Sequence, residues 1–132
     1  MTPLVDTDWL ADYLNGTPGA VRLLTSLLPQ GLAISLITFG EIYEGIYYGR
    51  NPRQAEQIFL RLLHGIDVLP LNRAIMRRFA RLRGDLRRRG QIIADPDILI
   101  AATALHHRLT IITRNLAHFQ RIPNLTIYQL SP

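Results

Sequence analysis

Residues 94–105 read Ala94-Asp95-Pro96-Asp97-Ile98-Leu99-Ile100-Ala101-Ala102-Thr103-Ala104-Leu105. This stretch predicts a helix over about 96–107, because Pro96 suits a first turn and the residues after Asp97 are apolar around the whole helical circumference. Such a helix is buried, so the carboxylate of Asp97 is drawn towards the interior. An unpaired buried carboxylate is expensive, and metal coordination is one of few remedies. We therefore interpret Asp97 as a metal ligand and Asp95 as the helix N-cap.

In the rest of the chain, short runs rich in β-forming residues alternate with longer segments whose apolar residues recur with the period of a helix. The alternation is typical of an α/β fold, a parallel five-stranded sheet with helices on both faces. A length of 132 residues without repeats or linkers predicts one domain, 1–132. The expected strands are 4–5, 32–35, 66–69, 109–113 and 125–128, and the expected helices are about 7–14, 18–28, 38–49, 52–64, 71–89 and 96–107, with a turn near 116–120.

The amino-acid composition indicates the compartment in which the protein is expected to work. Cysteine is absent, which excludes disulfides, thiolate metal sites and a cysteine nucleophile. The sequence also lacks an apolar run of membrane-spanning length, and its N-terminus does not have the pattern of a signal peptide. Together these features predict a soluble protein of the cytoplasm.

The net charge is +5, and all 15 basic residues are arginine. Arginine binds phosphate and carboxylate through a planar fork, so this surface suits a polyanion or an acidic protein, although biased genomic composition would give the same result. Eight arginines fall within residues 73–89, where apolar residues recur at spacings of three and four. The pattern predicts an amphipathic helix whose arginine face meets RNA, an acidic partner or only solvent.

Further polar residues stand at the ends of expected strands. Asp6 follows the first strand, Glu41 follows the second after one helical turn, and Asn115 follows the strand at 109–113. Ligands of parallel sheets bind at the carboxyl ends of strands, and carboxylates gathered there repel one another unless a cation such as Mg²⁺ lies between them. Each residue also has a structural interpretation: Asp6 as a helix cap, Glu41 in a capping box with Thr38, and Asn115 as a turn residue.

With these residues identified, the chain resembles the PIN-domain ribonucleases along its whole length, specifically the VapC-type toxins of bacterial VapBC toxin–antitoxin systems. No single motif is specific, but their order and spacing are. The motifs are Leu4-Val5-Asp6-Thr7-Asp8, then Ser35-Leu36-Ile37-Thr38-Phe39-Gly40-Glu41 followed by Gly45, then Asp97 to Leu105, and Thr113-Arg114-Asn115-Leu116-Ala117-His118-Phe119 before Ile122-Pro123.

The resemblance implies a PIN-like three-layer sandwich and an Mg²⁺-dependent endoribonuclease, with Mn²⁺ able to substitute. Such an enzyme hydrolyses RNA phosphodiesters with a metal-activated water. By position, Asp6, Glu41 and Asp97 match the metal-binding acids of the family, and Asn115 stands where many members have a fourth acid. The resemblance also implies a homodimer and a VapB-type antitoxin as partner. The identity of the RNA does not follow from it.

The residues around these acids have supporting interpretations. Thr7, Ser35 and Thr113 are expected to hydrogen-bond the ligating carboxylates, and Asp8 or Asp95 to add charge to the cluster. Arg114 is expected to contact RNA or the antitoxin. The imidazoles of His106, His107 and His118 are expected on the surface or in capping positions.

Other readings of the acids are open. Asp6-Thr7-Asp8 after a short strand also resembles the Asp-x-Asp motif of haloacid-dehalogenase-type phosphatases, and receiver domains gather acids at the same edge of a sheet. Both families ordinarily include a lysine, which this chain lacks. A non-catalytic PIN-like module that binds RNA or an antitoxin is a further alternative, supported by Asn115. The absence of a glycine-rich phosphate loop disfavours a nucleotide-binding fold.

Overall fold

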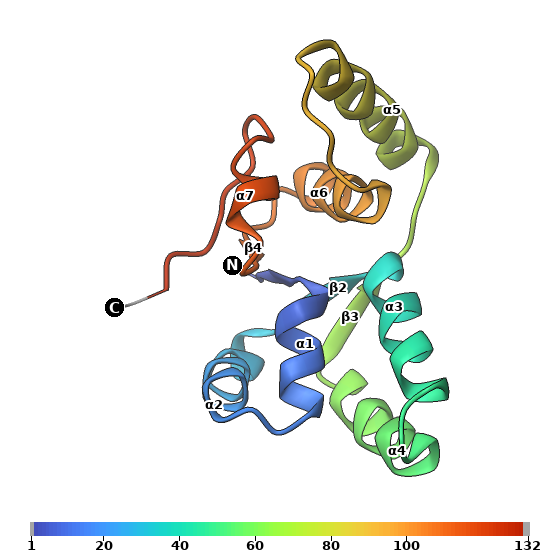
Figure 1. Ribbon diagram of the computed structural model, residues 1–132. Helices are drawn as coiled ribbons and strands as arrows, with labels where there is room; N and C mark the ends of the chain where they lie inside the picture. The colour runs from blue at the N-terminus through green and yellow to red at the C-terminus, as the bar shows by residue number, and fades with distance from the viewer. Residues whose placement is uncertain (1, 131–132) are drawn as a thin grey trace.

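A computed structural model describes residues 2–130 and places a parallel sheet at the centre of the molecule (Figure 1). Its strands are β1 (Leu4–Val5), β2 (Leu32–Ser35), β3 (Ile66–Leu69) and β4 (Ile111–Ile112), in the order β3-β2-β1-β4. Every pairing is parallel, so all four strands end at the same edge of the sheet. The predicted α/β class and the positions of these four strands are confirmed.

The expected fifth strand, 125–128, is reduced to a single parallel bridge between Ile111 and Ile127. Two backbone hydrogen bonds form it, from Ile111 N to Thr126 O (2.9 Å) and from Tyr128 N to Ile111 O (2.8 Å). The reason is the shortness of its neighbour: β4 covers two residues rather than the expected 109–113, and only Ile111 pairs with the following segment. The sheet therefore has four strands instead of five.

Helices cover both faces of the sheet, which gives the expected three layers. Neighbouring strand residues point to opposite faces. Val5 and Ile112 thus join one core with helices α1 to α4, while Leu4 and Ile111 join another with α5, α6 and α7. No helix within residues 2–130 is long and apolar enough to cross a membrane. The helices are α1 (Thr7–Leu14), α2 (Pro18–Leu27), α3 (Leu36–Tyr47), α4 (Pro52–Leu63), α5 (Arg73–Arg88), α6 (Asp95–His107) and α7 (Leu116–Phe119), with a 3-10 turn at Leu28–Gln30.

Two of the predicted helix caps are wrong. Helix α3 begins directly after β2, and the Ser35 hydroxyl caps it by accepting from the backbone N–H groups of Ile37 (3.0 Å) and Thr38 (3.2 Å). Thr38 is therefore inside the helix and fully buried, so it forms no capping box with Glu41. In α6 the cap position belongs to Ala94, because Asp95 already has helical conformation.

Helix α5 is the predicted amphipathic arginine helix, with Ile75 and Leu86 buried and most of its arginines exposed. It ends in a Schellman motif, in which Gly90 N donates to Arg87 O (3.0 Å) and Gln91 N to Leu86 O (2.8 Å). This ending requires a left-handed residue, and Gly90 provides it with a φ of 69°. The turn directs the chain back across the helix end towards α6.

Two glycine substitutions, one inside α5 and one just after its end, are expected to have effects of opposite sign. Replacing Gly90 by Ala forces a Cβ into the left-handed region and should lower the free energy of unfolding by about 1 kcal/mol. Replacing Gly84 by Ala, inside the helix and with open space around its Cα, should raise it by roughly 0.5–1 kcal/mol. Urea denaturation of both variants checks this, and shifts of the same sign would contradict the conformation assigned to Gly90.

Candidate active site

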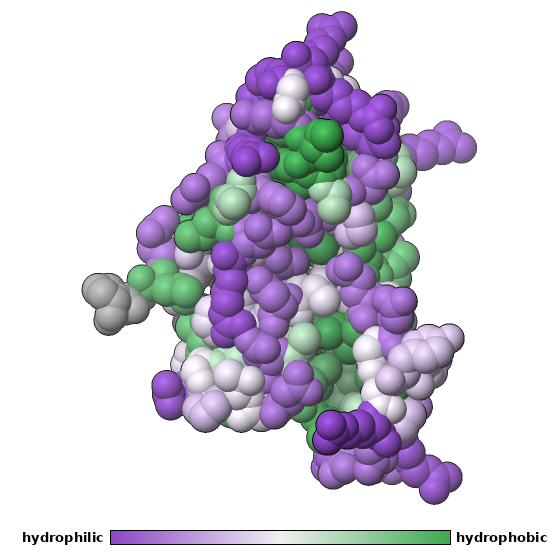
Figure 2. All heavy atoms as spheres, viewed as in Figure 1, coloured by the Kyte–Doolittle hydropathy of each residue, from purple (hydrophilic) through white to green (hydrophobic). Residues whose placement is uncertain are grey.

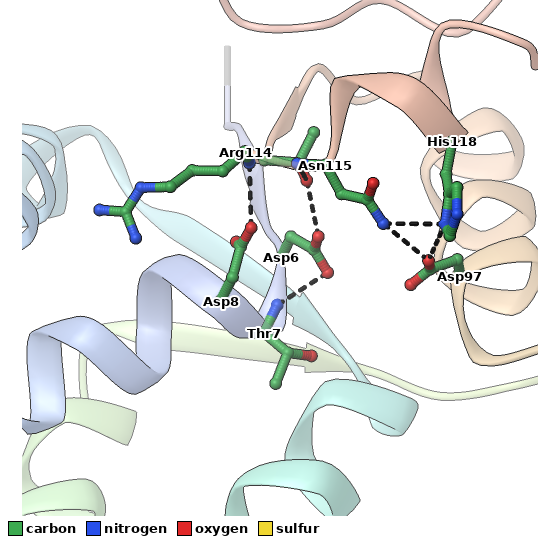
Figure 3. A network of polar contacts seen from close by, with 8 residues as sticks. Asp6, Thr7, Asp8, Asp97, Arg114, Asn115 and His118 are labelled. Atoms are coloured by element: carbon green, nitrogen blue, oxygen red, sulfur yellow. Dashed lines mark hydrogen bonds and ion pairs between the residues drawn. The ribbon is translucent and has the colours of Figure 1, made fainter. Parts of the chain in front are cut away.

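The site lies at the edge where the parallel strands end (Figure 3). Asp6 directly follows β1 and Thr113 directly follows β4, so the pairing of β1 with β4 brings them together. Asp97 reaches the same edge from the first turn of α6, and Asn115 from the residue before α7. The structure thus gathers residues that are more than a hundred positions apart in the chain.

Asp6 is the most buried carboxylate of the site, only 5 % exposed. Its Oδ1 accepts from Thr7 N (2.8 Å), as the expected helix cap does, and its Oδ2 accepts from the Thr113 hydroxyl (2.7 Å). Burial raises the pKa of the Asp6 carboxyl from its ordinary value of 3.8 to about 6. The bonds from Thr113 and Thr7 oppose this rise, and the charges of Asp8 and Asp97 add to it.

This environment fits a cation. A carboxylate that is desolvated and faces two further carboxylates is in the state that a bound divalent ion relieves, and oxygen ligands are those that Mg²⁺ prefers. Within residues 2–130, no three acidic or imidazole side chains lie close enough together to hold an ion. The metal-ligand set of Asp6, Glu41 and Asp97 therefore stays a prediction, supported by charge and burial.

Glu41 approaches the site through Thr7. The Thr7 hydroxyl donates to Glu41 Oε1 (2.7 Å) and lies 3.0 Å from the hydroxyl of the buried Thr38. Because Thr7 N also bonds Asp6, one residue holds two of the predicted ligands. Thr38 was not predicted here, since its sequence context suggested a cap.

Asp97 is held by two side chains from the segment after β4. Its Oδ2 lies 2.8 Å from His118 Nδ1 and 3.1 Å from Asn115 Nδ2, which in turn lie 2.8 Å from each other. The predicted surface or capping role of His118 is therefore wrong: this ring faces the site and is only about one-third exposed. Its spacing of three from Asn115, one turn of α7, was the signal available in the sequence. His106 and His107 end α6, as expected.

Asp8 and Arg114 form a second contact between α1 and the segment after β4. Asp8 Oδ2 accepts from Arg114 N (3.0 Å). The Arg114 guanidinium lies 4.0 Å above the Trp9 ring and pairs with Asp12, two residues that were not predicted. The arginine expected to contact RNA or antitoxin is thus already engaged with α1, and its contact with either partner stays a prediction.

The remaining predicted residues separate into those inside and those outside the site. The expected contact of Thr113 with Asp6 is present, and its hydroxyl also accepts from Asn115 N (3.0 Å). Ser35 caps α3 and, among residues 2–130, bonds no carboxylate, so its predicted contact is wrong. Asp95 is half exposed and pairs with Arg83 (2.7 Å), which directs it away from the cluster.

The raised pKa of Asp6 predicts that Asp6→Asn stabilises the metal-free protein. Below pH 3.8 the carboxyl is neutral in both folded and unfolded chains, and stability falls as pH rises towards 6, because only the unfolded chain ionises freely. At pH 7.5 the loss is roughly 3 kcal/mol, at about 1.4 kcal/mol per tenfold change. Asparagine avoids this loss but accepts fewer bonds, so we expect a gain of about 1–2 kcal/mol.

Thermal melts in chelator check this prediction. The melting temperature of Asp6→Asn should exceed that of the native chain by a few degrees at pH 7.5, and the order should reverse near pH 4, where the native carboxyl is largely neutral and keeps its hydrogen bonds. A difference that grows on acidification would show that Asp6 is stabilising when charged, contrary to the assigned pKa.

Comparisons with known proteins agree with this geometry. The family profile of the PIN domain matches residues 4–125. Ribonuclease VapC19 of Mycobacterium tuberculosis is 33% identical over 128 residues, covering 92% of this chain and 95% of its own, and ribonuclease VapC2 of Rickettsia felis is 27% identical over 129 residues, covering 96% of both. The crystal structure of the Rickettsia felis VapBC2 complex on promoter DNA aligns with a TM-score of 0.90 at 26% identity, over 99% of this chain and 100% of that one.

Proposed function

The chain belongs to the PIN-domain family, and from that premise we propose that it is the toxin of a type II toxin–antitoxin pair, an endoribonuclease that hydrolyses RNA phosphodiester bonds. The observation that carries the proposal is the environment of Asp6, a buried carboxylate of raised pKa that faces two other acids at the sheet edge. Relatives covering almost the whole chain are named as ribonucleases, which supports the same reaction.

We propose Mg²⁺ as the cofactor, replaceable by Mn²⁺, with Asp6, Glu41 and Asp97 as its ligands. When bound, a divalent ion lowers the pKa of water and stabilises negative charge on a phosphodiester. The chain's own contribution is to hold the acids ready: Thr113 and Thr7 restrain the Asp6 carboxylate, and Thr7 also restrains Glu41.

Asn115 and His118 have the corresponding role at Asp97. Both lie within hydrogen-bond distance of Oδ2, which leaves Oδ1 available to another partner. The Asn115 amide donates to Asp97. At this position, where the resemblance to the family implies a fourth acid, the chain therefore has a group that orients Asp97 and adds no charge. Asp8, fixed by Arg114 N, keeps a further negative charge beside Asp6.

We propose a VapB-type antitoxin as the partner, since two solved relatives are described as VapBC and another as a toxin–antitoxin complex. The chain also exposes apolar surface that suits a protein interface. On and just after α3, Leu36 is 42% exposed, Tyr47 63% and Tyr48 88%, and together they line a groove of about 460 Å³ beside Glu41. We propose that this face of α3 forms the contact between two copies of the chain in a homodimer. We also propose that toxin and antitoxin act in the cytoplasm.

Expression of the chain in a bacterium tests the function. Induction of the native chain should arrest growth and create discrete new RNA 5′ ends that carry phosphate, while Asp97→Asn should do neither. Sequencing of 5′ ends from both cultures identifies the RNA that is cut. Equal arrest by both chains, or no new ends with either, would favour the alternative that Asn115 suggests, a PIN-like module that binds RNA or antitoxin without cutting.

A further inference from the structure

A pocket of about 560 Å³ lies between the last turns of α5 and the first turn of α6. Asp95 lines it and precedes the predicted ligand Asp97 by two residues on the same helical turn, about 3 Å along the helix axis. The pocket and the candidate active site therefore lie at the same end of α6, with Asp95 and Asp97 on opposite sides of the helix. An extended chain bound at Asp97 reaches the pocket by continuing around the first turn of α6 towards α5.

The turn after α5 sets one wall of the pocket. The Schellman motif fixes Gly90 in its left-handed conformation and bonds Gln91 N back to Leu86 O. This brings Gln91 into the lining. Its Oε1 is buried without a hydrogen-bond partner within residues 2–130. A buried, unpaired amide oxygen is unfavourable, so the Gln91 side chain loses no hydrogen bond and gains one by turning its amide towards a ligand in the pocket that offers a donor.

The rest of the lining is apolar. Leu86, Ile93 and Ile98 are at most 5 % exposed, whereas Ile92 is 85% exposed. Figure 2 shows an apolar patch surrounded by hydrophilic atoms where Figure 1 has the segment joining α5 to α6. A ligand that matches this lining has flat apolar faces and hydrogen-bond donors at its edge. An unpaired nucleobase has both.

Two arginines one helical turn apart add positive charge to the pocket wall. Arg83 pairs with Asp95 through Nε at 2.7 Å, whereas Arg87 is exposed and forms no ion pair within the described residues. A guanidinium in this position suits a backbone phosphate of the nucleotide whose base occupies the pocket.

We propose that this pocket binds an unpaired base of the RNA, within a nucleotide or two of the phosphate that is cleaved. Gln91 contacts the edge of the base, the apolar lining contacts its faces, and Arg87 contacts its phosphate. The inference rests on the proposed function, because it takes RNA as the substrate. An acidic peptide would satisfy Arg87 but has no flat apolar group to accompany the charge, so RNA fits the whole lining better.

Binding of short RNA to the full-length chain tests the pocket. The probes are fluorescein-labelled hexamers of A, C and U, measured by fluorescence anisotropy in chelator, so that no cleavage occurs. Arg87→Gln should weaken all three hexamers by roughly fivefold and lower the salt dependence by about one phosphate contact. Arg77→Gln, the same change at an exposed α5 position outside the pocket, should weaken them less than about twofold.

Gln91→Leu tests recognition of the base itself. It keeps the size of the side chain and removes the unpaired oxygen, so the chain should melt no earlier than the native one. We expect the affinity for the preferred hexamer to fall by about tenfold and the others to change little. Equal effects of the two arginine variants, or an unchanged order of the hexamers in Gln91→Leu, would overturn the inference.

Two further measurements test whether the pocket binds a protein instead of RNA, and whether the chain is a ribonuclease at all. Hexaglutamate binding that requires Arg87 and Gln91, or a dimer that Ile92→Asp dissociates in gel filtration, would assign the pocket to a protein and overturn the inference. RNA cleavage in Mg²⁺ distinguishes failure of the pocket inference from failure of the proposed function. A native chain that cuts RNA while the pocket variants bind and cut as it does refutes only the pocket. A native chain that neither binds nor cuts RNA refutes the proposed function.

Discussion

Asp97→Asn is expected to reduce the kcat/KM of RNA cleavage by the purified chain on the order of 10³-fold. The substitution keeps the shape of the side chain and replaces a charged oxygen by an amide nitrogen, which cannot ligate a cation. Because Asp97 is 21% exposed and its neighbours His118 and Asn115 can still bond the remaining oxygen, the fold should persist. The loss therefore measures the missing carboxylate and not unfolding.

Asp67→Asn is the matched control for this experiment. It makes the same chemical change on the exposed side of β3, where the carboxylate takes no part in the site. Its kcat/KM should stay within about twofold of the native value. The proposed role of Asp97 would be refuted if the two variants lost activity equally, or if Asp97→Asn retained more than a tenth of native activity while melting normally.

Much of this architecture could be predicted because it depends on local patterns. The buried run after Asp97 identifies α6, and prolines at positions 18 and 52 begin α2 and α4 as their fixed φ predicts. Position at a strand end also predicted that Asp6 lies at the edge of the sheet, because the carboxyl ends of parallel strands meet at one edge. These inferences need no knowledge of what packs against what.

Other features depend on distant contacts that no local pattern contains. The ring of His118 faces Asp97 only because α6 and α7 pack together, and Thr38 meets Thr7 only because α1 and α3 do. The predicted cap of α3 was wrong for a related reason: the helix begins three residues earlier than a cap at Thr38 requires, so Ser35 is the cap. The fifth strand failed because pairing length is set by the neighbouring strand, here only two residues long.

Mg²⁺ is expected to raise the melting temperature of the native chain at pH 7.5 and to be required for cleavage. At a concentration one hundred times its dissociation constant, a ligand of the folded state adds about 2.7 kcal/mol, or roughly 10 °C for a chain of this length. Chelator should remove both the shift and the activity. The shift should shrink as pH falls below about 6, because the proton then competes with the cation for Asp6.

The variant Asp6→Asn tests whether Mg²⁺ binds at this site. The substitution should change the melting temperature in opposite directions without and with Mg²⁺. Without metal the variant should melt above the native chain, since it avoids a desolvated charge. With Mg²⁺ it should gain almost nothing, so the native chain overtakes it, while Asp67→Asn follows the native chain in both conditions. An Mg²⁺ shift that survives in Asp6→Asn would place the cation elsewhere. The crossing of the two melting temperatures would show that the chain gives up stability at Asp6 and recovers it when the ion binds.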